Sequence, residues 1–203
     1  MRPRMSNRIL AAALIAAMSA PTLAQPLPAT PVAIQEVPIA IETSDGRIVV
    51  ALDKTHAPVT TANFLHYVDT HRFDGETFYR AMKVGDGGLV QGGIRSNGLK
   101  LYPPIKHEPT SETGLHNVAG AISMANGGPG TARADFFILA SDIPALDATA
   151  TDPGFAVFGH VTEGMDVVQK ILGSSVSPTK GEGAMKGQML DPVVKIIKVE
   201  RVK

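Results

Sequence analysis

Apolar positions in this chain come mostly in short runs rich in valine, isoleucine and phenylalanine, separated by glycine, proline and aspartate. Runs of this kind predict β-strands. The predicted strands cover residues 39–41, 48–52, 77–82, 89–94, 118–124, 135–140, 155–161 and 193–200. Asp45-Gly46 separates the first two runs and indicates a hairpin. We expect the last strand to pair with the first and close the sheet.

Two segments instead carry apolar residues three and four positions apart, which predicts helices. The first starts at Pro58, a residue suited to a first helical turn. The second covers residues 162–173, with Thr162 as the expected N-cap. The apolar stripes consist of Phe64, Tyr67 and Val68 in the first helix and Met165, Val168 and Leu172 in the second. Strands without regular βα alternation favour a mainly β fold, a closed eight-stranded antiparallel barrel capped by two α-helices.

Composition narrows the function classes. The 203 residues are enough for one domain with a sizeable core. Lys+Arg and Asp+Glu both number 19, so no basic excess points to nucleic acid as a partner. The chain has no cysteine, which excludes disulfides, a catalytic thiol and thiolate metal ligands. No feature demands an oligomer, and we expect a monomer.

The N-terminus differs from the rest of the chain. Residues 1–24 combine arginines, a short apolar run and small residues before the expected cleavage point near Ala24, as secretory signal peptides do. An uncleaved anchor is the alternative, but the apolar run is short for a membrane span. We therefore expect a periplasmic or secreted protein without stable membrane insertion. Residues 25–37 form a proline-rich linker, and residues 38–203 form the domain.

Residues 78–93 contain a glycine-rich stretch that invites comparison with phosphate-binding loops. A dinucleotide-binding loop needs a third glycine where Val90 stands. A P-loop needs lysine and a hydroxyl residue where Gly93 and Ile94 stand. The stretch therefore predicts a bulged hairpin in which backbones approach closely, and no phosphate site.

Other catalytic patterns are also missing from the sequence. The six histidines have no metal-ligand spacing, so we expect neither a metal nor another cofactor. Ser123 lacks the glycine frame of a serine nucleophile. Asp135 could act as a general acid or base, although a structural carboxylate is the favoured interpretation. What remains is a set of binding groups, including an arginine on a strand among aromatic residues.

Several short segments, in this order, resemble those of one known family. They are Phe78-Tyr79-Arg80, Leu89-Val90-Gln91-Gly92-Gly93, Ser123-Met124-Ala125-Asn126 with Pro129, Asp135-Phe136-Phe137-Ile138, Leu146-Asp147 and Val157-Phe158-Gly159. The family is that of the cyclophilin peptidyl-prolyl cis/trans isomerases, and the resemblance runs from about residue 37 to 202. It implies an eight-stranded barrel with a helix at each end. It also implies that the partners are proline-containing, unfolded or partly folded polypeptides.

The resemblance further implies a site without a nucleophile. Arg80 and Gln91 are the expected catalytic residues. The expected substrate-binding residues are Leu89, Met124, Ala125, Asn126, Phe137, Leu146 and Phe155. Without the resemblance, apolar residues such as Leu89 and Phe137 would be assigned to the core.

The sequence also departs from the family pattern. Gly88 stands where many members carry a phenylalanine, and the segment between Arg80 and Gln91 is a few residues longer than usual. Asp135 replaces the usual glutamine, and Ala145 stands where some members carry an aromatic residue. One wall of the proline pocket would then be missing, unless the longer segment supplies another apolar group. The alternative function is a weakly active or inactive module that binds proline-containing peptides. A small-ligand carrier is disfavoured because long, regular up-and-down strands are absent from the pattern.

Overall fold

One antiparallel sheet dominates the computed structural model, which describes residues 33–95 and 97–202. Its strands are β1 (Glu36–Thr43), β2 (Gly46–Asp53), β3 (Thr77–Val84), β4 (Gly87–Gly93), β5 (Ala121–Met124), β6 (Phe136–Leu139), β7 (Ala156–Glu163), β8 (Val176–Ser177) and β9 (Met189–Arg201). Eight of them follow in the order β1-β2-β7-β5-β6-β4-β3-β9, and β9 pairs with β1 to close the ring. The predicted closed barrel is confirmed, and β8 adds a short ninth strand beside β9.

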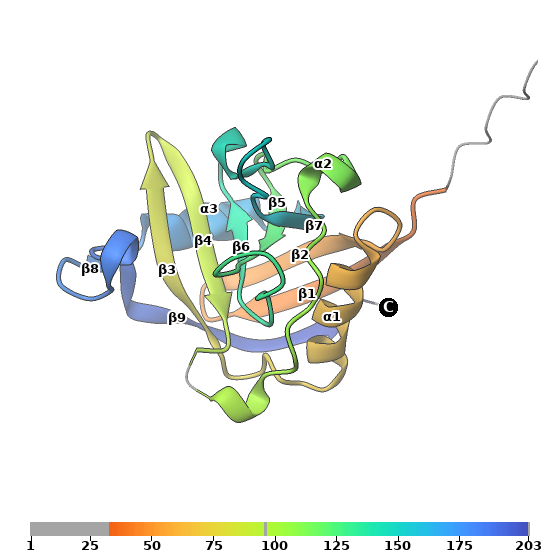
Figure 1. The fold of residues 1–203 in the computed structure, drawn as a ribbon. Helices are drawn as coiled ribbons and strands as arrows, with labels where there is room; N and C mark the ends of the chain where they lie inside the picture. The colour runs from red at the N-terminus through yellow and green to blue at the C-terminus, as the bar shows by residue number, and fades with distance from the viewer. Residues whose placement is uncertain (1–32, 96, 203) are drawn as a thin grey trace, which may run out of the picture. The chain divides into compact units, whose positions relative to one another are not determined.

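The helices lie around this barrel (Figure 1). They are α1 (Pro58–Asp69), α2 (Thr110–Thr113) and α3 (Met165–Gly173), with 3-10 turns η1 (Gly98–Lys100), η2 (Pro144–Leu146) and η3 (Gly183–Met185). Helix α1 packs against β2, β7 and β9, whereas α3 packs against β2, β3 and β4. Both predicted helices are therefore present and cap the barrel.

The start of α3 differs from the sequence prediction. Thr162 belongs to β7, and its hydroxyl donates to the carbonyl oxygen of Val49 at 3.3 Å instead of capping the helix. The N-cap is Gly164, whose φ of 86° lies in the left-handed region. A side chain there would overlap the carbonyl oxygen of Arg47. Close approach of two backbones, rather than a capping hydroxyl, therefore sets this boundary.

Aromatic rings fill the barrel interior. Phe136 makes edge-on contacts with Phe64, Phe73 and Phe78, at centroid distances of 5.2, 5.7 and 5.6 Å. Phe158 also packs on Phe64, at 5.2 Å. All five rings are fully buried. Because α1 supplies Phe64, this cluster joins the helix to the barrel.

The glycine-rich stretch forms most of the β3–β4 hairpin. Its two-residue turn is Gly85-Asp86, and Gly85 has a φ of 57° that suits glycine. The extra residues between Arg80 and Gln91 lengthen the two strands and do not form a loop. The predicted bulge is also present: Phe78 pairs with Gly92 and Arg80 pairs with Gln91, which leaves Tyr79 as the extra residue.

The predicted signal peptide and most of the predicted linker lie outside the described residues. Strand β1 begins at Glu36, two residues before the expected start of the domain. No helix within residues 33–95 and 97–202 is long and apolar enough to cross a membrane. The same residues contain no cluster of three or more His, Cys, Asp or Glu side chains that could hold a metal ion.

Candidate active site

Arg80 and Gln91 face each other across β3 and β4. The Nη1 group of Arg80 donates a hydrogen bond to Oε1 of Gln91 at 2.8 Å. Nε2 of Gln91 in turn donates to the hydroxyl of Tyr79 at 2.8 Å. The bulge makes this possible, because it turns both Tyr79 and Arg80 away from the barrel interior. Gln91 is therefore fixed at both ends of its amide and holds one edge of the guanidinium.

Two further groups contact the Arg80 guanidinium. Nε donates to Oε1 of Gln188 at 2.8 Å, and Nη2 lies 3.3 Å from the sulfur of Met82. Burial lowers the pKa of Arg80, and the nearby Tyr79 partly opposes this effect. Arginine nevertheless keeps its charge, since its usual pKa is far above neutrality. The site thus presents a permanent cation in an orientation set mainly by Gln91 and Gln188, because a thioether sulfur is only a weak acceptor.

An apolar cavity of about 170 Å³ opens beside this guanidinium. It is lined by Arg80, Met82, Leu89, Gln91, Ala125, Asn126, Phe137, Leu146, Phe155 and Met185. Phe137 and Phe155 meet edge to face at a centroid distance of 5.4 Å. The structure therefore brings eight of the nine predicted site residues to one cavity. Its chemistry suits a compact apolar ring that carries a polar backbone group.

The pleat of the strands explains why these residues meet. In β4, Leu89 and Gln91 point outward while Val90 joins the barrel core. In β6, Phe137 points outward, whereas Phe136 and Ile138 point inward. Strands β4 and β6 are paired, with Gln91 opposite Phe137. Alternation therefore builds the cavity floor on the outer face of the same strands whose inner face makes the core.

Met124 is the predicted site residue that the structure does not bring to the cavity. Its side chain is 1% exposed and packs in the barrel core with Phe136 and Ile122. The reason is again alternation: Ser123 points away from the core, so both of its neighbours in β5 point inward. The next residue, Ala125, lies beyond the end of β5 and does reach the cavity. Assigning the Met124 side chain to substrate binding is thereby corrected.

Gly88 does not leave the cavity without a wall. Its φ is 144°, and a side chain there would overlap the backbone carbonyl of Met82. No larger residue fits this position in the observed hairpin. Met82 lies opposite Leu89 and lines the cavity itself. The longer hairpin thus supplies an apolar group from β3.

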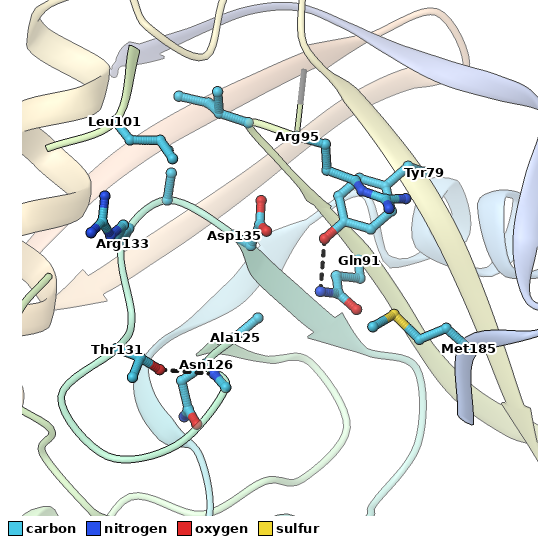
Figure 2. Close-up of a pocket in the computed structure, with 13 residues that line it drawn as sticks. Tyr79, Gln91, Arg95, Leu101, Ala125, Asn126, Thr131, Arg133, Asp135 and Met185 are labelled. Carbon is cyan, nitrogen blue, oxygen red and sulfur yellow. Dashed lines mark hydrogen bonds between the residues drawn. The ribbon is translucent and has the colours of Figure 1, made fainter. Parts of the chain in front are cut away.

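A second cavity of about 340 Å³ continues from the first, and the two share Gln91, Ala125, Asn126 and Met185. Figure 2 shows Gln91, Tyr79 and Asp135 on one side of it. Two buried polar atoms here, Nδ2 of Asn126 and Oδ1 of Asp135, have no hydrogen-bond partner among the described residues. The two cavities adjoin, and the second is the more polar of the two, so we call it the polar half of the site.

Asp135 is a largely buried carboxyl group in the polar half of the site. Burial raises the pKa of this carboxyl group to about 6, although Tyr79 and Arg95 lower it in part. The guanidinium of Arg95 lies over the Tyr79 ring, 4.6 Å from its centroid. Asp135 therefore changes its charge close to neutral pH, next to Tyr79, which accepts a hydrogen bond from Gln91.

The family model described as cyclophilin type peptidyl-prolyl cis-trans isomerase/CLD matches residues 38–201. This chain belongs to that family. It is therefore a peptidyl-prolyl cis-trans isomerase with the cyclophilin fold.

Named relatives and solved structures agree with the family assignment. The chain is 37% identical over 202 residues to peptidyl-prolyl cis-trans isomerase A of Dickeya dadantii, which covers 96% of this chain and all of that protein. It is 35% identical to a peptidyl-prolyl cis-trans isomerase of Acinetobacter baylyi, over 83% of this chain and 87% of that protein. A crystal structure of a cyclophilin type isomerase from Cryptosporidium parvum has a TM-score of 0.67 at 19% identity, covering 83% of this chain and 99% of that one.

One lobe of this cyclophilin-type site depends on a buried asparagine that the sequence did not single out. The backbone N–H and the side-chain Nδ2 of Asn117 both donate to Oδ1 of Asp147 at 2.8 Å. Nδ2 of Asn117 also lies 3.1 Å from the carbonyl oxygen of Leu146, which accepts from the backbone N–H of Phe155 at 3.0 Å. This network fixes the two apolar walls contributed by Leu146 and Phe155.

Three further site residues were also missed from sequence. Met82 is two positions after Arg80 on the same strand, so alternation predicts it on the same face and could have found it. Met185 and Gln188 lie in the segment before β9, about 100 residues from Arg80 in the sequence. No local pattern marks them, because their position depends on how that segment folds back against β3.

Proposed function

We propose that this isomerase acts on proline-containing segments of exported polypeptides and that Arg80 is its catalytic residue. The observation that carries the proposal is the fixed guanidinium of Arg80 at the rim of an apolar cavity. A second crystal structure of the Cryptosporidium parvum cyclophilin, with a TM-score of 0.65, was determined in the presence of the dipeptide Ala-Pro. That dipeptide supports proline-containing peptides as the substrate class.

The cavity suits the proline ring. Phe137 forms its floor, with Leu89, Leu146 and Phe155 as walls. Apolar contact with these side chains holds the ring while the polar backbone before it remains at the rim. Ala125 and Asn126, which line both cavities, can hydrogen-bond an extended peptide through their backbone groups.

Arg80 acts on the bond that rotates. Resonance gives the peptide C–N bond a rotational barrier of about 18–20 kcal/mol. In the twisted transition state this resonance is lost and the proline nitrogen becomes pyramidal, so that it can accept a hydrogen bond. A guanidinium N–H placed there binds the twisted state more tightly than either planar state, which lowers the barrier. No covalent bond breaks, so no nucleophile is needed. Gln91 keeps Arg80 in position.

Export is the second part of the proposal. The arginines, apolar run and small residues of residues 1–24 support a cleavable signal peptide, and the proline-rich residues from 25 up to the start of β1 at Glu36 then form a linker ahead of the domain. We expect a monomeric periplasmic or secreted protein. Intact-mass measurement on protein from the cell envelope should show cleavage near Ala24. An exported protein that retains Met1 would contradict this part alone.

The enzymatic part is tested with a short X-Pro peptide. Uncatalysed cis/trans exchange takes tens to hundreds of seconds at 25 °C, and the wild type should make it faster. Arg80→Ala should lower kcat/KM at least about tenfold, equivalent to about 1.4 kcal/mol. Lys83→Ala is the matched control, since Lys83 is an exposed basic residue on the same strand and lines neither cavity.

The binding-module alternative makes the opposite prediction. It was suggested by Gly88, but Met82 provides an apolar wall in its place. If the wild type bound an X-Pro peptide yet exchanged it at the background rate, the protein would be a binding module. If Arg80→Ala remained fully active, another group would be the catalyst.

A further inference from the structure

We propose that Gln188 is a positioning residue for catalysis, and that it holds the Arg80 guanidinium jointly with Gln91. This inference rests on the proposed catalytic role of Arg80. It assigns part of the active site to residues 184–188, which run from within η3 to the residue before β9 and lie outside every segment that carried the family resemblance.

The two glutamines bind different nitrogen atoms of the planar Arg80 guanidinium. Nε of Arg80 donates to Oε1 of Gln188, and Nη1 donates to Oε1 of Gln91, both at 2.8 Å. A single hydrogen bond would let the guanidinium swing about that contact. Two bonds to separate nitrogens fix both its tilt and its rotation. Of the five N–H donors of arginine, two are thus used for support. The remaining donors are on Nη1 and Nη2, next to the cavity, and one of those on Nη2 is directed at the sulfur of Met82.

Gln188 is itself held firmly enough to act as a support. Its Nε2 donates to the carbonyl oxygen of Ala184 at 2.8 Å, and its backbone N–H donates to the carbonyl oxygen of Met185 at 3.1 Å. Its own carbonyl oxygen accepts from the backbone N–H of Ala81 at 2.9 Å, the residue after Arg80. The segment is therefore bonded to β3 beside the catalytic residue.

The same segment also shapes the cavity. Met185 lines both cavities and is directly linked to Gln188 through the backbone bond described above. Figure 1 shows the segment between β8 and β9 next to β3, at the hairpin that carries Arg80. The fold thus delivers a hydrogen-bond acceptor and an apolar side chain to the site from one short segment near the C-terminus.

A purely structural role for Gln188 makes different predictions from a positioning role, and two variants separate them. Gln188→Met keeps the side-chain length but removes both the acceptor for Arg80 and the donor to Ala184. Gln188→Glu keeps an acceptor for Arg80 and loses only the donor. Gln169→Ala is the control, because Gln169 donates to the carbonyl oxygen of Ala140 from α3 and lines neither cavity.

The experiment measures kcat and KM on an X-Pro peptide for each full-chain variant, with thermal unfolding followed by circular dichroism. Gln188→Met should lower kcat/KM about fivefold, mainly through kcat, because the support matters most when Arg80 binds the twisted state. Gln188→Glu should retain most of the activity. Gln169→Ala should match the wild type.

A double-mutant cycle tests whether Gln188 acts through Arg80. In an Arg80→Ala background, Gln188→Met should cause no further loss, since its effect passes through Arg80. The same fivefold loss in that background would overturn the inference, and so would wild-type activity of Gln188→Met or equal defects in Gln188→Met and Gln188→Glu. Full activity of Arg80→Ala alone would instead overturn the catalytic role of Arg80, and the positioning role with it.

Discussion

The inner and outer faces of β4 and β6 differ in kind, although they alternate along the same few residues. Inward, Val90, Phe136 and Ile138 are fully buried among other apolar groups. Outward, Leu89 and Phe137 belong to a separate, smaller cluster that borders the cavity. Gln91 joins them on that face and carries the hydrogen bonds that hold Arg80. The same two strands therefore supply side chains both to the barrel core and to the cavity.

The difference shows where this protein accommodates polar groups. The buried rings of the interior contact one another, whereas the outer face has a partly buried cation and two buried polar atoms without partners among the described residues. Unpaired buried polar groups reduce stability. Both of these atoms border the cavities, where a bound peptide can supply partners. Substitutions inward should therefore change mainly stability, and substitutions outward mainly activity.

The largest effect should come from two adjacent phenylalanines. Phe136→Ala removes a ring that contacts three others and should lower the free energy of unfolding by about 3–5 kcal/mol. Phe137→Ala should cost less stability, because its space opens to the cavity, but it should lower kcat/KM more than tenfold, or about 1.4 kcal/mol. Urea unfolding and the exchange assay measure the two effects. Equal stability losses and equal activity losses in both variants would remove the distinction between the faces.

Replacing Asp135 should show how much its buried charge lowers the free energy of unfolding. Burial raises its pKa to about 6 from a usual value of 3.8. Between these values the native protein keeps a proton that the unfolded chain has lost, so this contribution to stability is full at low pH and disappears as pH rises through 6. Asp135→Asn should raise the free energy of unfolding at pH 8 by up to about 3 kcal/mol, at about 1.4 kcal/mol per pKa unit.

The control for this variant is the same pair of proteins compared at a second pH. At pH 4, where the native carboxyl group is protonated, the wild type and Asp135→Asn should have similar free energies of unfolding. Urea titrations at the two pH values measure both. A stability difference that is the same at pH 4 and pH 8 would contradict the raised pKa.

A smaller difference in unfolding free energy is expected between alanine substitutions at two glycines of the hairpin. Gly88→Ala must place a side chain against the carbonyl of Met82 at a φ of 144°, and should cost about 1–3 kcal/mol in unfolding free energy. Gly85→Ala meets no neighbouring atom and has only a left-handed φ of 57° to tolerate, so about 1 kcal/mol is expected. Thermal unfolding compares them. If Gly88→Ala were the milder change, the close approach of β3 and β4 would be absent in solution.

The smallest effect should come from the side chain that replaces the missing wall. Met82→Ala should raise KM for an X-Pro peptide a few-fold and leave kcat almost unchanged, because an apolar wall binds planar and twisted states alike. Val84→Ala, further along the same strand and outside both cavities, is the control. An unchanged KM in Met82→Ala would mean that the wall is supplied elsewhere.

The sequence allowed the barrel and most of the residues that line the cavity to be predicted, for different reasons. The barrel followed from short apolar runs and turn residues. Arg80, Gln91 and Phe137 followed from a family resemblance, and their meeting depends on three strands, because β4 pairs with both β3 and β6. Met124 shows the limit of carrying over a motif, since adjacent residues in a strand point to opposite faces.

What could not be predicted depends on contacts distant in sequence. Gln188 reaches Arg80 across 108 residues, and nothing in its neighbourhood marks it as a partner. Thr162 has the features of an N-cap, but pairing of β7 with β2 extends the strand past it. Gly88 suggests a missing wall for a similar reason, because the sequence does not reveal that Met82 lies opposite Leu89. In each case tertiary pairing overrode a local signal.

Replacing Arg80 by lysine tests the central claim most directly. Lysine keeps the positive charge but lacks the rigid fork of donors that Gln91 holds and that, in the proposed mechanism, binds the proline nitrogen. We predict that Arg80→Lys lowers kcat/KM on an X-Pro peptide about tenfold or more, while urea unfolding stays within about 0.5 kcal/mol of the wild type because the side chain lies on the outer face. Wild-type kcat/KM in Arg80→Lys would show that a positive charge alone suffices and would contradict the account.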